Sequence, residues 1–320
     1  MSIHDNNIYI RKYLKMAKLC IKSTKNWPQA FLFRLGFLNK IDINLRNIGR
    51  VKLTKTENNL LSSLIIASLE ELTNKQKKTI HTIISQKNDP IININGIKIM
   101  NYELCLIIEN FVLDQFDMEK GNGENIIDIG ANRADTALYF ANKGYNVIGF
   151  EPVKDLFEKG IKNINLNKNL KNQIILVNKA IGCKNGKTKI FFNNDLDNSS
   201  GDASSYLKEK ENFEIVETIT IEKILKDYNI KPYILKIDCE GCEVDIILNS
   251  DLSMFKEIYF EYHTPFTNVQ PETMIKKLEN QNFELITKNK MILDSGFGII
   301  KMINKGIWLI WYSTLKLKFH

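Results

Sequence analysis

The spacing of apolar residues divides the chain into a mainly helical first part and a longer part in which strands and helices alternate. A period of three to four residues predicts helices, and short alternating runs around Asn-Gly-type turns predict hairpins. In the first part the predicted helices are 8–26, 28–38, 57–72 and 75–85, and the predicted hairpins are 41–53 and 91–100. We therefore interpret residues 1–100 as an accessory region and residues 101–320 as a separate domain.

From residue 101 a helix over 102–116 leads into short apolar runs that alternate with amphipathic stretches. The predicted strands are 125–129, 146–150, 174–177, 187–192, 218–220, 233–237 and 257–262, and the predicted helices are 134–143, 153–167, 221–228, 243–248 and 271–281. Strands that alternate with helices form parallel sheets covered by helices. Three further strands, 283–287, 298–302 and 307–312, have no helix between them and predict antiparallel strands at one edge.

This order predicts an α/β fold with a mostly parallel sheet and antiparallel C-terminal edge strands. A dinucleotide-binding sheet repeats its strand–helix half a second time, which the helix-free end of this chain does not do. The order resembles the class I methyltransferase (Rossmann-like) sheet, which ends in a hairpin.

Composition narrows the protein class. Of the 320 residues, 44% are hydrophobic and 25% charged, which is typical of a globular protein and not of a disordered chain. No apolar run reaches the length of a membrane span, residues 1–7 lack the apolar core of a signal peptide, and five scattered cysteines are too few for a disulfide framework. These features predict a cytoplasmic protein.

The charge is concentrated at one end. Residues 1–60 carry a net charge of +9 and the remaining residues −2. A basic stripe runs along the predicted helix 8–26, formed by Arg11, Lys15, Lys18, Lys22 and Lys25. Three interpretations stay open: a solvated face, a surface that rests on anionic lipid at the membrane periphery, or a guide for a phosphorylated or glycan substrate.

The first candidate site follows the predicted strand 125–129. The sequence Asp128-Ile-Gly130-Ala-Asn132 combines a glycine that permits close backbone approach with a following helix. Glu151 ends the next strand, 21 residues after Gly130, where a carboxylate can accept hydrogen bonds from both hydroxyls of a ribose. This pattern predicts a nucleoside cofactor; the alternative is a plain strand–turn–helix with a surface glutamate.

The second candidate site follows the predicted strand 233–237. In Lys236-Ile-Asp238-Cys-Glu240-Gly-Cys-Glu243 three acids lie within six residues at the edge where α/β sheets bind ligands. The alternative is an acidic helix start favoured by the helix dipole, which suits Glu243 better than Asp238. Cys239 and Cys242 lack a second cysteine pair for zinc, so we expect them to fill small apolar positions.

Together these motifs resemble the FkbM-type S-adenosylmethionine-dependent methyltransferases over about residues 95–290. The matching positions are Asp128, Gly130, Ala131, Asn132, Glu151, Pro152, Ser204, Ser205, Lys236, Asp238, Glu240, Gly241 and Glu243. One position departs from the family, because Ala134 stands where a glycine is usual. Its methyl group would lie near the amino-acid end of the cofactor, which puts cofactor affinity in question.

The resemblance implies that Asp128, Gly130, Asn132 and Glu151 bind S-adenosyl-L-methionine and that Asp238 lies beside its methyl group. It also implies transfer to a hydroxyl group, with Asp238 and Glu240 as catalytic candidates beside the methyl group. His263 is a third catalytic candidate, because it lies with Asp238, Glu240 and Glu261 at the same predicted edge of the sheet. His263 is a candidate base because histidine titrates near neutrality; the alternative is a loop residue that only donates a hydrogen bond. No metal ligand is assigned, although a divalent ion at Asp238 with Glu261 or His263 stays open.

The predicted acceptor is a hydroxyl-bearing small molecule, a glycan or a lipid-linked sugar. An RNA 2′-hydroxyl methyltransferase and a catalytically weak cofactor-binding module are the alternatives. Nucleic acid is the less favoured partner because the acidic strand edge would repel phosphates. The sequence does not identify the acceptor or the oligomeric state.

Overall fold

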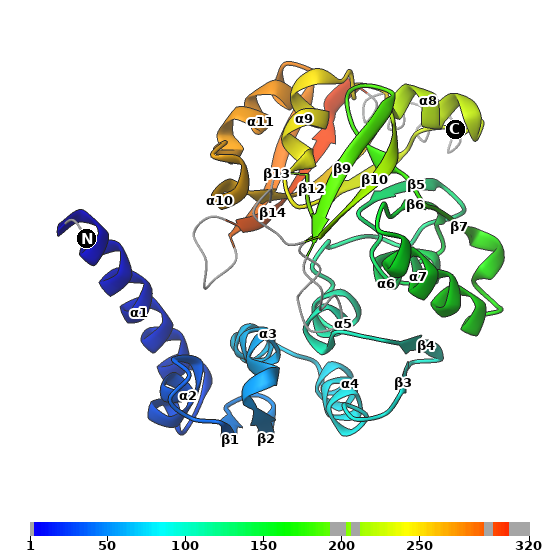
Figure 1. Cartoon of the computed structure of the whole chain (residues 1–320). Coiled ribbons are helices and arrows are strands. Elements are labelled where there is room, and N and C mark those ends of the chain that lie inside the picture. Colours follow the sequence, from blue (N-terminus) through cyan, green and yellow to red (C-terminus); the bar gives the residue numbers. More distant parts are fainter. Residues whose placement is uncertain (1–2, 193–202, 206–211, 291–296, 307–320) are drawn as a thin grey trace, which may run out of the picture. The chain divides into compact units, whose positions relative to one another are not determined.

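The computed structural model describes residues 3–192, 203–205, 212–290 and 297–306. These residues form two compact units, the first ending at Asp117 and the second beginning at Met118. The sequence analysis placed this boundary at residue 100; in the structure the segment from 101 to 117 belongs to the first unit. Figure 1 shows the elements of both units.

The first unit is mainly helical. Its elements are α1 (Ile3–Ser23), α2 (Trp27–Arg34), β1 (Lys40–Leu45), β2 (Gly49–Thr54), a 3-10 turn (Lys55–Glu57), α3 (Asn58–Leu69), α4 (Asn74–Ser85), β3 (Ile91–Ile94), β4 (Ile97–Met100) and α5 (Leu104–Phe111). The most apolar of the long helices, α3, lies at the centre, where it contacts α1, α2, α5 and the β1–β2 hairpin. Helix α5 is shorter than the predicted 102–116, and Asp114 just beyond it has a positive φ of 51°.

The second unit contains a seven-stranded sheet in the order β13-β14-β12-β11-β5-β6-β7. The strands are β5 (Asn125–Ile129), β6 (Asn146–Phe150), β7 (Ile174–Val177), β11 (Ile234–Ile237), β12 (Glu257–His263), β13 (Phe283–Lys290) and β14 (Phe297–Asn304). The first five strands in chain order pair in parallel, whereas β14 is antiparallel to both β12 and β13. The predicted class I methyltransferase topology with an antiparallel C-terminal edge is thus confirmed. The predicted strand 307–312 lies outside the described residues.

Helices cover this sheet. They are α6 (Asp135–Asn142), α7 (Lys154–Leu166), α8 (Ile221–Asp227), α9 (Cys242–Asn249), α10 (Thr264–Thr267) and α11 (Pro271–Glu279). Helix α6 packs on β5, β6 and β7, while α9 packs on β12 and on α11 (Figure 1). The main core lies along β11 and β12, whose apolar residues are almost completely buried.

A small second sheet was not foreseen from the sequence. It joins β8 (Ala180–Ile181), β10 (Asn212–Ile219) and β9 (Gly186–Phe192) in the order β8-β10-β9. The predicted strand 218–220 is therefore the end of a longer strand. Most of β10 alternates exposed and partly buried positions because only one of its faces packs.

The register of the large sheet brings the candidate site residues to one edge. Ile237, the last residue of β11, pairs with Ile129 on one side and Phe260 on the other. Because these strands are parallel, the loops after β5, β11 and β12 leave the sheet together. Among the described helices none combines the length and apolar character needed to cross a bilayer.

Candidate active site

The turn after β5 touches the loop after β11. Gly130 has φ +77°, and a Cβ atom on it would lie only 1.7 Å from the carbonyl oxygen of Asp238. The amide of Asp238 donates a hydrogen bond to the carbonyl of Ile129 at 3.0 Å. The close backbone approach that requires a glycine at position 130 is therefore to the loop of the second candidate motif. The expected approach of this turn to a ligand stays a prediction.

The buried side chain of Lys236 connects the turn after β5 with the loop after β11. The Lys236 ammonium, 1% exposed, lies 3.0 Å from Asp128 Oδ1 and 3.6 Å from Asp238 Oδ2, and it donates to the Gly130 carbonyl at 3.0 Å. Burial disfavours the ammonium, but the charges of Asp128 and Asp238 outweigh burial and raise the pKa of Lys236. Asp128 is fully buried and also accepts from Thr136 Oγ1 at 2.7 Å, so its carboxylate organises the turn. Its role as a direct cofactor ligand stays a prediction.

Glu151 lies at the end of β6, next to this turn. Its carboxylate accepts from the amides of Asn132 at 2.9 Å and Val153 at 2.8 Å. Burial raises the pKa of Glu151 to about 7, although both amide hydrogen bonds act in the opposite direction. Each carboxylate oxygen retains a lone pair, and Asn132 Oδ1 is buried without a hydrogen-bond partner among the described residues. This set of acceptors beside a glycine turn fits a nucleoside with free hydroxyl groups.

Cofactor affinity is expected to depend on pH through Glu151. Hydroxyl donors favour the carboxylate form, so affinity for S-adenosylhomocysteine should rise as the pH increases through the Glu151 pKa of about 7. From pH 6 to pH 8 the gain is about tenfold. Glu151→Gln should remove this dependence and weaken binding by about 1.5–3 kcal/mol. Calorimetry at several pH values measures both effects.

Glu109 provides the matched control. It is a half-buried residue on α5 in the first unit, with a carboxyl pKa that desolvation also raises to about 7. Glu109→Gln should leave the pH dependence of cofactor binding intact. If Glu151→Gln retains the dependence as well, Glu151 does not contact the ribose.

Ala134 corrects one expectation from the sequence. It was predicted to start the helix, but it precedes α6 with φ 62° and ψ 23°, in the left-handed region. Its side chain is fully buried and faces Gly160 of α7, where an added Cβ would lie 3.4 Å away. Glycine, the usual residue of the family at this position, adopts this left-handed conformation without strain. For Ala134 the same conformation destabilises the folded state by roughly 1–2 kcal/mol.

Ala134→Gly is consequently expected to leave the free energy of unfolding unchanged or to raise it by up to about 1 kcal/mol, because relief of strain offsets the lost methyl burial. Cofactor affinity should be equal or better. Ala137→Gly, inside α6 and equally buried, is the control and should lose at least about 1 kcal/mol. Denaturant unfolding of both variants distinguishes the two cases; a similar loss in both would show that Ala134 is not strained.

The loop between β11 and α9 is tightly constrained. Glu240 and Gly241 have positive φ angles of 55° and 120°, and Cys239 and Cys242 form a disulfide across them. Ser204 Oγ donates to the Glu240 carbonyl. The expectation that the two cysteines merely fill apolar positions was incomplete: they pack against the core and are also bonded to each other.

Glu243 lies in the first turn of α9, as the helix-start interpretation expects, but its side chain does not face solvent. It is fully buried, and its carboxylate accepts from the Gly241 amide at 2.8 Å, from the His263 amide at 3.2 Å and contacts His263 Nδ1 at 3.1 Å. Its place in the first turn of α9 agrees with the helix-dipole interpretation, and the structure adds a contact with His263. No local sequence pattern indicates this contact, because it joins residues 20 positions apart on different elements.

Three glutamates, Glu240, Glu243 and Glu261, lie close to the His263 imidazole. Nε2 is 3.3 Å from Glu240 Oε2, and Nδ1 faces Glu243. Burial disfavours the imidazolium, but the Glu243 hydrogen bond and the charges of Glu240 and Glu261 raise the pKa of His263 well above its ordinary value. The sequence-based reason for a base, titration near neutrality, does not hold in this environment.

Asp238, Glu261 and His263 converge at the ends of β11 and β12, with candidate ligand atoms all within 4.8 Å of one another. The structure thus brings together the predicted catalytic residues Asp238, Glu240 and His263. The loop that carries Asp238 is in direct contact with the Gly130 turn. Carboxylates in this position can receive a proton or hold a cation beside a reacting group. Glu261 was expected from the sequence only as a possible ligand of a divalent ion, and in the structure it joins this group.

Residues 128–285 match the sequence model of a family described as methyltransferase FkbM domain. A search of curated proteins found no match.

Solved structures with a similar fold include three at 11–15% identity. The methyltransferase FkbM from Methylobacillus flagellatus KT has 11% identity and a TM-score of 0.42, covering 76% of this chain and 58% of that one. M. capricolum TrmK, solved with S-adenosyl-homocysteine, has 14% identity and a TM-score of 0.39, covering 61% and 68%. A Streptococcus agalactiae protein of the NADB-Rossmann superfamily has 15% identity and a TM-score of 0.35, covering 59% and 64%. The chain spans less than two thirds of the first and third of these proteins.

Proposed function

We propose that this chain, whose residues 128–285 match the methyltransferase FkbM domain, uses S-adenosyl-L-methionine to methylate a hydroxyl oxygen. The observation that carries the proposal is the cluster of Asp238, Glu240, Glu261 and His263 beside the Gly130 turn. Formation of an O–CH₃ bond releases the hydroxyl proton, and a nearby carboxylate provides an acceptor for it. The cofactor supplies the electrophilic methyl group.

The residues of the chain supply position and charge. Glu151 and Asn132 would hold the nucleoside through their acceptor oxygens. Lys236 keeps the Asp238 loop against the Gly130 turn, so the acceptor and the methyl group are oriented for in-line displacement. Asp238 and Glu240 are the proposed proton acceptors, since the pKa of His263 is raised.

The acid-rich edge supports a neutral or cationic acceptor, such as a small molecule, a glycan or a lipid-linked sugar. A polyphosphate backbone would be repelled there, which disfavours the RNA 2′-hydroxyl alternative. Fractionated cell extract incubated with ¹³C-methyl-labelled S-adenosylmethionine tests the proposal, because the ¹³C chemical shift distinguishes O-methyl from N-methyl and C-methyl products.

An O-methyl product in a non-nucleic-acid fraction is expected. A product methylated on nitrogen or carbon would overturn the proposal. Cofactor binding without any product in any fraction would instead support the catalytically weak binding module.

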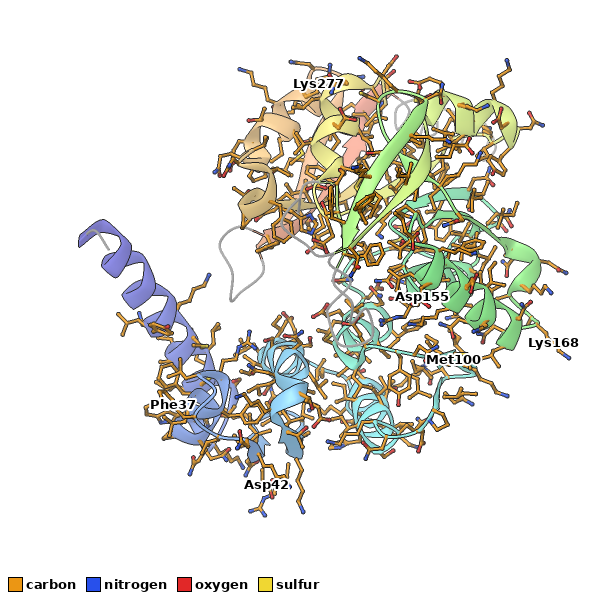
Figure 2. The ribbon with its side chains drawn as sticks, viewed as in Figure 1. Phe37, Asp42, Met100, Asp155, Lys168 and Lys277 are labelled. Carbon is orange, nitrogen blue, oxygen red and sulfur yellow. A yellow bond between two sulfur atoms is a disulfide. The ribbon has the colours of Figure 1, made fainter. Side chains whose placement is uncertain are left out.

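The first unit offers a second proposed contact, with anionic lipid. Exposed lysines on or just after α1 lie among exposed apolar side chains, including Leu14, which is 57% exposed. Phe37, just after α2, is 74% exposed (Figure 2). Basic and apolar groups on one helix are typical of surfaces that rest on membranes.

Flotation with vesicles should detect this contact at low salt when phosphatidylserine is present. Replacing Lys15, Lys18 and Lys22 with glutamine should weaken it by about 1 kcal/mol per lysine. The control replaces Lys75, Lys77 and Lys78 on α4, which removes the same charge from the same unit. Equal binding by both triple variants, or no binding at low salt, would contradict the lipid contact.

A further inference from the structure

Three potential metal-ligating side chains meet at the carboxyl ends of two adjacent parallel strands. Asp238 follows β11, and Glu261 and His263 lie two positions apart on β12, so their side chains point to the same face. Their candidate ligand atoms lie within 4.8 Å of one another. Two carboxylates and one imidazole form a mixed oxygen and nitrogen donor set.

His263 is held as a metal-ligating histidine would be. Its ring is 3% exposed and stacks on Phe266 with centroids 5.8 Å apart, while Phe297 packs edge-on at 5.6 Å. Glu243, fully buried, engages Nδ1 at 3.1 Å and is itself fixed by two backbone amides. A carboxylate on one ring nitrogen commonly orients the other nitrogen toward a metal. Here Nε2 is that nitrogen. It lies 3.3 Å from Glu240 Oε2, so a metal ion bound to Nε2 would take the place of this contact.

The charges at this edge would also attract a cation. Asp238, Glu240 and Glu261 converge near the His263 imidazole, and Lys236 lies 3.6 Å from Asp238. A divalent ion held among these carboxylates would interact favourably with all three of them. The aromatic side chains beside His263 exclude water from one side, which strengthens the interaction of any ion bound there.

We infer that Asp238, Glu261 and His263 bind one divalent first-row transition cation, with Glu243 as the positioning residue that orients His263. The imidazole donor favours Mn²⁺, Fe²⁺ or Zn²⁺ over Mg²⁺ and Ca²⁺, which prefer oxygen ligands alone. Bonds of about 2.0–2.2 Å place neighbouring ligand atoms about 3–4 Å apart. Small side-chain rotations within the observed 4.8 Å limit would achieve this.

The use of this ion rests on the proposed function, but its binding does not. A cation beside the acceptor hydroxyl lowers the pKa of that hydroxyl. With Asp238 engaged as a ligand, Glu240 remains as the carboxylate that can receive the proton. The expected acceptors are then hydroxyl compounds able to coordinate a metal.

Electron paramagnetic resonance of Mn²⁺ titrated into the full-length protein tests the site without any acceptor. Mn²⁺ is chosen because it binds oxygen and nitrogen ligands well and thiolates poorly, and the Cys239–Cys242 disulfide is kept oxidised during the titration. We expect one bound ion per chain with a spectral modulation from imidazole nitrogen. Glu261→Gln should reduce binding at least tenfold, and His263→Gln should also remove the nitrogen modulation.

Two further variants separate roles. Glu243→Gln should weaken binding 10–100-fold while the nitrogen modulation persists at saturation, as expected of a positioning residue. Glu279→Gln, an exposed acid on α11, should have no effect. Absence of Mn²⁺ binding, or binding that Glu261→Gln leaves unchanged, would overturn the inference.

Calorimetry with S-adenosylhomocysteine keeps the two proposals distinguishable. If the cofactor binds and methyl transfer proceeds without Mn²⁺ binding, the metal inference fails and the proposed function stands. If Mn²⁺ binds but the products are methylated on nitrogen or carbon, the proposed function fails and the metal site stands.

Discussion

Replacing Asp238 with asparagine is expected to lower kcat at least about a hundredfold, the scale on which a proton acceptor contributes to catalysis. Cofactor affinity should change less than tenfold. The amide keeps the shape of the side chain at the end of β11 but loses the charge that faces Lys236 at 3.6 Å and the ability to ligate a cation strongly. Steady-state kinetics with the identified acceptor, together with calorimetry, measure the two effects separately.

Two additional measurements assign the loss. Circular dichroism should show a folded variant, because Lys236 keeps its closer contact with Asp128. Treatment of the wild type with EDTA should reduce the rate, and Mn²⁺ should restore it, if Asp238 acts as a ligand. Wild-type turnover in the asparagine variant would remove Asp238 from the chemistry, and loss of cofactor binding alone would make it a cofactor residue.

The central strands of the large sheet could be predicted because burial on both faces requires short runs of apolar residues. Residues 125–129 and 146–150 are short apolar runs, since a central parallel strand is buried on both faces, and the structure has β5 and β6 over the same residues. The run 174–177 was also predicted with the bounds of β7, although β7 is the edge strand and Ile175 is 50% exposed.

Strand β10 was mostly missed because Glu214 and Glu217 interrupt its apolar pattern. The exposed face of β10 carries Phe213 and Ile215 as well as Glu217, so its sequence does not show the usual alternation of apolar buried and polar exposed residues.

The candidate site was predictable as a location but not in its internal contacts. Asp238 follows β11 and His263 ends β12, and because these neighbouring strands are parallel, both residues lie at the same edge of the sheet irrespective of side-chain packing. The Glu243–His263 contact depends on the packing of α9 against β12, which no local pattern encodes. The positive φ of Ala134 was hidden for a different reason, because alanine normally favours the right-handed helix.

Gly130→Ala is expected to have the largest effect on stability, about 3–5 kcal/mol in the free energy of unfolding, the range of severe core disruptions. Two costs add. Alanine at φ +77° is strained, and its Cβ would lie 1.7 Å from the Asp238 carbonyl oxygen, which is backbone and has no side-chain rotamer to relieve the clash. Separation of the two loops should also break the Asp238–Ile129 hydrogen bond and abolish binding of S-adenosylhomocysteine.

Gly123→Ala separates these two costs. Gly123 precedes β5 in the same unit with a similar φ of +86°, but the nearest atom to an added Cβ is Asn146 Nδ2 at 3.8 Å, an ordinary contact. Backbone strain alone should cost this control about 1–2 kcal/mol, and its cofactor binding should persist. Urea unfolding and calorimetry of both variants provide the comparison. Equal losses would mean that the two loops separate at little cost, and the close approach of the Gly130 turn to Asp238 would then not be what positions the site.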